Sequence, residues 1–75
     1  MQHYSKLQIY KGMIQYLLES TPYTLKTIAD LSHSSIKSIR SIYYYDQIPR
    51  NFSTELGLVK LYHMVLELNL HGINH

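Results

Sequence analysis

Two prolines constrain the fold of this chain more than any other feature of its sequence. Pro22 and Pro49 divide the 75 residues into three segments, and each interrupts regular helix because proline has no backbone N–H and clashes with the preceding turn. Within every segment, apolar residues recur at the three- and four-residue spacing of an amphipathic helix. We therefore predict an all-α fold, a single compact domain of four to five helices over residues 1–75.

The helix boundaries follow from this periodicity and from the capping residues. The four predicted helices span about residues 5–19, 24–31, 35–44 and 53–69. Thr24 is a natural N-cap for the second helix, and Gly72 marks the end of regular structure. The side chains expected to face the core are Leu7, Tyr10, Ile14, Leu17 and Leu18 in the first helix, Leu25, Ile28 and Ala29 in the second, Ile36, Ile39, Ile42 and Tyr43 in the third, and Leu58, Leu61, Tyr62, Val65 and Leu68 in the last.

The composition excludes several classes of protein. The chain has no cysteine, which excludes disulfides, a cysteine-ligated zinc site and a thiol nucleophile. No glycine-rich phosphate loop or catalytic triad spacing occurs, and the five histidines form no pair within a predicted helix that would hold a metal. We therefore predict no enzyme activity, cofactor, metal or small-molecule ligand. The apolar runs are too short for a signal peptide or a bilayer span, which favours a cytoplasmic protein without a membrane partner.

The stretch from Thr24 to Tyr43, TLKTIADLSHSSIKSIRSIY, has the spacing of a helix-turn-helix. Two short helices can cross steeply only where a small residue lies at their contact, and Ala29 occupies that position. Ile39 and Ile42 follow ten and thirteen residues later, on the inner face of the second predicted helix. In proteins with this motif, the second helix enters the major groove of DNA while the first lies across the backbone.

The same stretch resembles the helix-turn-helix of lac-repressor-type proteins without a gap. The helices before and after it resemble the arrangement of phage repressors of the Cro/C1 type. The matching residue types are Thr24, Leu25, Lys26, Ile28, Ala29, Leu31, Ser35, Ile39 and Ile42. The family usually has glycine where this chain has His33, so the resemblance implies a left-handed backbone at that position. At the next position the family usually has an apolar residue, where this chain has Ser34. The resemblance implies sequence-specific binding of double-stranded DNA by a small transcriptional regulator, with the 35–44 helix in the major groove.

The resemblance also implies roles for individual residues on the outer side of the two helices. Thr24 and Lys26, at the start of the first of them, would bind a DNA phosphate. The residues of the second helix that would face bases or phosphates are Ser35, Ile36, Lys37, Ser38, Arg40, Ser41 and Tyr44. No acidic residue interrupts residues 32–45, whereas a merely solvated helix face normally mixes Glu with Lys. We therefore favour DNA contact over plain solvation for this face.

The last predicted helix has more apolar surface than one core-facing stripe requires. The excess residues, together with two residues near the C-terminus, predict a homodimer interface made of Val59, Met64, Leu66, Leu70 and Ile73. A two-fold dimer would place two recognition helices about 34 Å apart on DNA. The net charge is only +2, which leaves an alternative open: a helical protein–protein interaction module, an adaptor or inhibitor, that keeps the fold without binding DNA.

Overall fold

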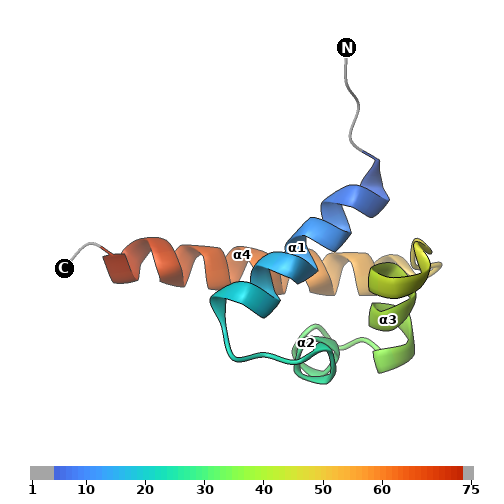
Figure 1. Cartoon of the computed structure of the whole chain (residues 1–75), viewed down its shortest axis with the longest axis horizontal. Helices are drawn as coiled ribbons and strands as arrows, with labels where there is room; N and C mark the ends of the chain where they lie inside the picture. Colours follow the sequence, from blue (N-terminus) through green and yellow to red (C-terminus); the bar gives the residue numbers. More distant parts are fainter. Residues whose placement is uncertain (1–4, 74–75) are drawn as a thin grey trace, which may run out of the picture.

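The fold is all-α, as the sequence predicts. The computed structural model describes residues 5–73, with side chains described through Leu70. Its helices are α1 (Lys6–Ser20), α2 (Leu25–Leu31), α3 (Ile36–Tyr45) and α4 (Phe52–Ile73). α4 runs along the longest axis of the molecule, α1 crosses it obliquely, and α2 and α3 lie together on one side of it (Figure 1). None of these helices combines the length and hydrophobicity that a bilayer span requires.

Side-chain caps determine where three of the four helices begin. Ser5 and Gln8 form a capping box at the start of α1, each side chain bonding the other residue's backbone N–H. Thr24 accepts a hydrogen bond from the N–H of Thr27 at the start of α2, and Ser35 does the same for α3. The predicted helix starts are therefore within one residue of the observed ones.

The predicted end of α4 is wrong. The helix continues four residues beyond residue 69 and includes Gly72, because a glycine in a helix costs only about 1 kcal/mol and does not by itself end one. The C-terminal part of α4 extends beyond the point where α1 crosses it (Figure 1). Leu68, predicted to be in the core, is consequently 63% exposed.

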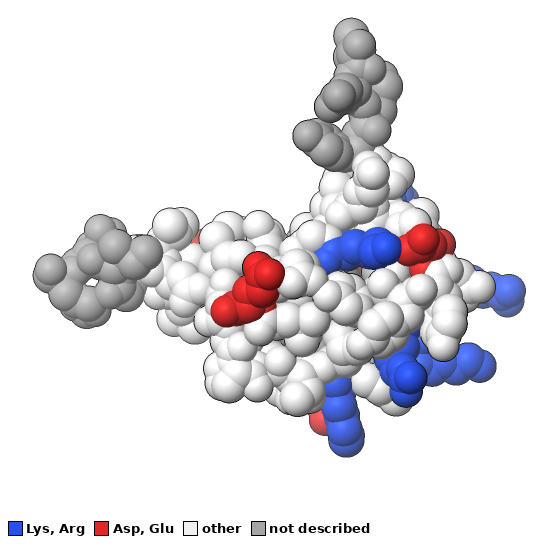
Figure 2. All heavy atoms as spheres, in the orientation of Figure 1, with Lys and Arg blue, Asp and Glu red and all other residues white. Residues whose placement is uncertain are grey.

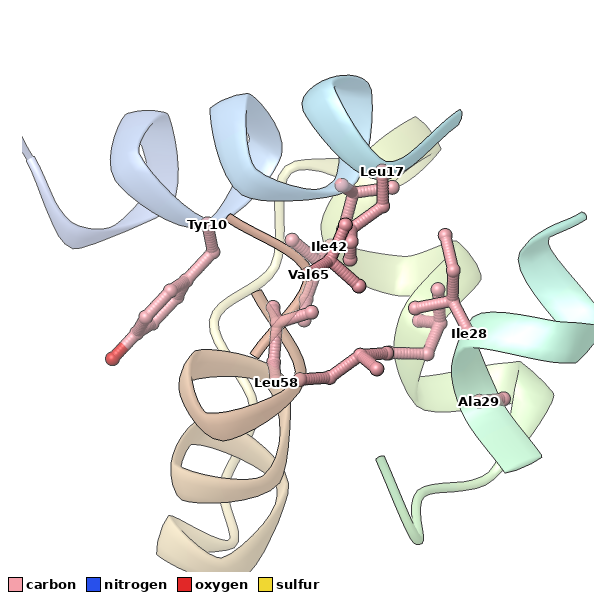
Figure 3. Close-up of a cluster of buried hydrophobic side chains, with 10 residues drawn as sticks. Tyr10, Leu17, Ile28, Ala29, Ile42, Leu58 and Val65 are labelled. Carbon is pink, nitrogen blue, oxygen red and sulfur yellow. The ribbon is translucent and has the colours of Figure 1, made fainter. Parts of the chain in front are cut away.

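All four helices contribute to one hydrophobic core (Figure 3). Its buried members are Tyr10, Ile14 and Leu17 of α1, Ile28 and Ala29 of α2, Ile39 and Ile42 of α3, and Leu58, Leu61 and Val65 of α4. Every one of these residues was expected on a core-facing side. Ile36 is the second exception to the predicted core, because it is the first residue of α3 and its side chain is 39% exposed.

The tyrosines fill the edges of this core. Tyr16 and Tyr62 pack edge to face with ring centroids 5.4 Å apart, which connects α1 to α4. Tyr43 also packs against the core, as predicted, and its hydroxyl donates a hydrogen bond to Gln15 of α1.

Three polar contacts fix α1 against the ends of other helices. The hydroxyl of buried Tyr10 donates a 2.5 Å hydrogen bond to Glu55 in the first turn of α4, and Lys6 lies 3.7 Å from the same carboxylate. Burial of the ring, and then the hydrogen bond and negative charge of Glu55, raise the pKa of Tyr10 to about 12. Lys11 lies 2.5 Å from Asp46, the residue that ends α3 in a left-handed conformation. The relative positions of α1, α3 and α4 therefore depend on side-chain pairs as well as on apolar packing.

α4 packs against the turn between α2 and α3 at very short range. The position of a Cβ on Gly57 would lie 2.0 Å from the carbonyl oxygen of Ser32, so only glycine allows this approach. Ser32 itself is 1% exposed, and its hydroxyl donates a 2.7 Å hydrogen bond to the carbonyl of Ile28. The backbone of α4 at Gly57 thus packs directly against the turn that precedes α3.

Candidate nucleic-acid interface

The turn between α2 and α3 has the backbone conformation that the resemblance implies. His33 has a φ of 59°, in the left-handed region where glycine is the usual residue. The N–H of Ser34 then donates to the carbonyl of Ala29 at 2.8 Å, and Ser35 begins α3 as its N-cap. Ser34 is half-buried, and its hydroxyl bonds to Ser32, so a hydrogen bond replaces the apolar contact expected at this position.

The residues predicted to face DNA from α3 differ in accessibility. Five of them are exposed, namely Ser35, Ile36, Lys37, Arg40 and Tyr44. Ser38 and Ser41 are half-buried, and the hydroxyl of Ser38 hydrogen-bonds to that of Ser35 at 2.9 Å. The N-terminal half of α3 therefore presents two exposed cations and one exposed isoleucine, with serine hydroxyl groups beside them.

The two predicted phosphate contacts on α2 are exposed but already have partners. The hydroxyl of Thr24 accepts from the N–H of Thr27, and it also lies 3.0 Å from the hydroxyl of Thr27. The ammonium of Lys26 lies 3.3 Å from Asp30, one turn further along the same helix. This surface pair reduces the positive charge that Lys26 presents to solvent.

The cations that lack an acidic partner are concentrated around α3. Lys6, Lys11 and Lys26 each lie within ion-pairing distance of a carboxylate. Across residues 5–73, the remaining cations have no such partner: Lys37, Arg40, Arg50 and Lys60. In Figure 2, Lys and Arg side chains gather over the side of the molecule where α3 and the following loop lie.

Two adjoining hollows flank the outer face of α3. One, of about 460 Å³, lies between α3 and the loop of residues 47–51, and the other, of about 450 Å³, lies along the opposite side. Both include Lys37, Ser41 and Gln47. The first hollow also includes Arg50, and the second includes Arg40. All three unpaired cations of this region therefore line one continuous surface.

The sequence-based prediction missed Arg50 and Tyr45. Arg50 lines the first hollow, while the ring of Tyr45, 65% exposed, lines the second; Tyr44 lines neither. A basic residue beside Pro49 in the loop directly after the predicted recognition helix is the signal that would have indicated Arg50. Tyr45 was predicted to follow the helix, whereas α3 extends to include it.

Most of the predicted dimer residues lie on the exposed side of α4. Val59, Met64 and Leu70 are 37%, 50% and 56% exposed, and Leu66 is half-buried. The side chain of Ile73 lies outside the described residues. Phe52 and Leu56 are also exposed on α4, at 68% and 41%.

Comparison with known proteins finds no match to this chain among family models, curated proteins or solved structures.

Proposed function

We propose that this protein binds double-stranded DNA sequence-specifically, as a small transcriptional regulator, with α3 in the major groove. The observation that supports this most strongly is the position of Lys37, Arg40 and Arg50. These three cations have no carboxylate partner among the described residues and line the surface on both sides of α3. Unpaired positive charge around one exposed helix is what phosphate binding and guanine recognition require.

The side chains on α3 and at the start of α2 suit contacts both to DNA bases and to the phosphate backbone. Lys37 and Arg40 are exposed on the N-terminal half of the helix, where a lysine or arginine can bind the O6 and N7 acceptors of guanine. The exposed side chain of Ile36 offers an apolar contact to a thymine methyl group. Thr24 and Lys26 are exposed at the start of the preceding helix, where they would bind the flanking backbone, with a phosphate replacing Asp30 as the partner of Lys26.

The test is selection of bound duplexes from a random-sequence library, followed by affinity measurements over a range of salt concentrations. We expect enrichment of a defined sequence and a binding constant that falls steeply with salt. Three phosphate contacts give a slope of about −3 for log K against log salt concentration. No enrichment, or binding that does not weaken with salt, would exclude this function and favour the interaction-module alternative.

We also propose that a second copy of the chain packs on α4. The residues along its exposed side alternate in spacing by four and three positions, which is the heptad pattern of helices that pack in pairs. The positions in this stripe are Phe52, Leu56, Val59, His63, Leu66 and Leu70. A strip of this period is complementary to its own copy, and a dimer gives two recognition helices on one DNA site.

This stripe differs from the predicted interface in its members. At about 100° per residue, Met64 lies about 120° around α4 from the centre of the stripe. It is therefore left out of the proposed contact, whereas Phe52, Leu56 and His63 are added to it. His63 is the one polar residue in the stripe, and it lies 3.5 Å from Glu67 on the same helix.

A further inference from the structure

The hollow between α3 and the 47–51 loop has the chemistry of a phosphate-binding site. Cations line both of its sides, Lys37 from α3 and Arg50 from the loop. Hydroxyl groups of Ser38, Ser41 and Thr54 line it between them, and no carboxylate does. Guanidinium and ammonium groups with nearby hydroxyl donors are the set that binds phosphate oxygens, since arginine offers a planar fork and lysine a compact charge.

The hollow forms because the chain reverses its direction at the end of α3. Asp46 adopts a left-handed conformation with a φ of 54°, and its N–H donates to the carbonyl of Ser41. The N–H of Gln47 donates to the same carbonyl at 3.0 Å, so the following residues run back beside α3. The 2.5 Å contact between Lys11 and Asp46 holds this reversal from the side of α1 and neutralises the one acidic residue of the loop.

The other end of the loop is fixed by the start of α4. The side chain of Asn51 accepts from the N–H of Ser53 at 2.8 Å, and its carbonyl accepts from the N–H of Thr54 at 3.0 Å. Arg50 therefore projects from a short loop that hydrogen bonds hold at both ends. A site that is already formed loses less entropy on binding a ligand than one that must be ordered first.

We propose that this hollow binds a phosphate group, with Arg50 and Lys37 as the charged contacts. Its volume of about 460 Å³ exceeds that of a single phosphate, so the group can arrive as part of a larger molecule. A phosphodiester of a nucleic-acid backbone and the phosphate of a free small molecule present the same oxygens to these residues. The assignment goes beyond the DNA-binding proposal, because it requires only that the hollow takes a phosphate.

The experiment is an amide ¹H–¹⁵N NMR titration of the whole chain with sodium pyrophosphate, compared with sodium chloride at equal ionic strength. We expect saturable shifts in the amides around the hollow, at Ser38, Ser41, Gln47 and Asn51. Arg50→Gln should raise the dissociation constant for pyrophosphate at least about tenfold. Lys60→Gln removes the same charge from an exposed residue outside the hollow, and should change that constant less than about twofold.

Lys37→Gln provides a second variant that should weaken pyrophosphate binding as Arg50→Gln does. Shifts that do not saturate, or that Lys60→Gln reduces as much as Arg50→Gln, would overturn the assignment. Adding duplex DNA to the pyrophosphate complex then identifies the source of the phosphate. Displacement of pyrophosphate indicates a nucleic-acid backbone, and persistence of its saturable shifts indicates a free phosphorylated molecule. If DNA does not bind at all while pyrophosphate does, the DNA-binding proposal fails and the phosphate site remains.

Discussion

Substitution of alanine for each of two helical glycines should change stability in opposite directions. Gly57 of α4 faces the turn after α2, where an added Cβ would lie 2.0 Å from the carbonyl oxygen of Ser32 and 3.1 Å from its carbonyl carbon. Carbon and oxygen atoms that are not bonded do not approach within about 3.0 Å, so α4 or the turn would have to move by about 1 Å. That movement would separate Leu58 and Leu61 from the core they share with α2.

The size of the effect follows from two opposing contributions. Overpacking of this kind typically costs about 1–3 kcal/mol, and contact with backbone rather than a flexible side chain favours the upper end. Replacing glycine by alanine inside a helix otherwise raises the free energy of unfolding by about 1 kcal/mol. We therefore expect Gly57→Ala to lower the free energy of unfolding by about 2 kcal/mol, or about 8–16 °C in Tm for a domain of this size.

Gly12 of α1 provides the matched control, because a Cβ there would meet no atom within 4 Å. Gly12→Ala should raise the free energy of unfolding by about 0.5–1 kcal/mol. Urea denaturation followed by circular dichroism at 222 nm measures both variants. A Gly57→Ala protein that is as stable as the Gly12→Ala protein would refute the close packing of α4 against the turn.

Three further predictions concern the Tyr10 pair, the turn and the dimer. Because folding raises the pKa of Tyr10 from 10 to about 12, the folded state holds the hydroxyl proton more tightly than the unfolded state does. The free energy of unfolding should therefore fall by up to about 2–3 kcal/mol as pH rises from 10 to 12. Urea denaturation across that range measures this fall, which should be absent in Tyr10→Phe. His33→Gly should leave the Tm unchanged or raise the stability by about 1 kcal/mol, since it removes a Cβ from a left-handed position, and a clear loss would show a specific side-chain contact. Val59→Glu combined with Leu70→Glu should give a folded monomer in sedimentation at about 100 µM, whereas Leu68→Glu, on exposed surface outside the stripe, should stay dimeric; a monomeric wild-type chain would assign the stripe to a different protein.

The parts of the fold that the sequence predicted well are those determined by neighbouring residues. Thr24 and Ser35 bond to N–H groups three residues away, so their effect on helix starts is visible in the sequence. Apolar spacing identified Ile39 and Ile42 as core residues because the period of a helix is fixed. The prediction of a left-handed conformation at His33 was based on the resemblance to helix-turn-helix proteins, because histidine itself does not indicate that conformation.

The features that the sequence did not reveal depend on contacts between distant segments. Gly57 and Ser32 are far apart in the chain, and no local pattern indicates that their backbones meet. Periodicity shows which side of α4 is apolar but not how much of its length α1 covers, which is why Leu68 was misplaced. Arg50 lies in a loop without periodicity, and its position depends on how Asp46 turns the chain beside α3.

The proposed function depends on contact between α3 and DNA through its unpaired cations. Its most direct test is fluorescence anisotropy with a selected duplex, comparing wild type with Lys37→Ala and Arg40→Ala, and with Lys60→Ala as a control for the loss of one charge. We predict that the first two variants each lose about 1–3 kcal/mol of binding free energy with little change in Tm, and that Lys60→Ala binds nearly as well as wild type. A protein with both Lys37 and Arg40 replaced by alanine that still bound DNA like wild type would contradict the proposed contact.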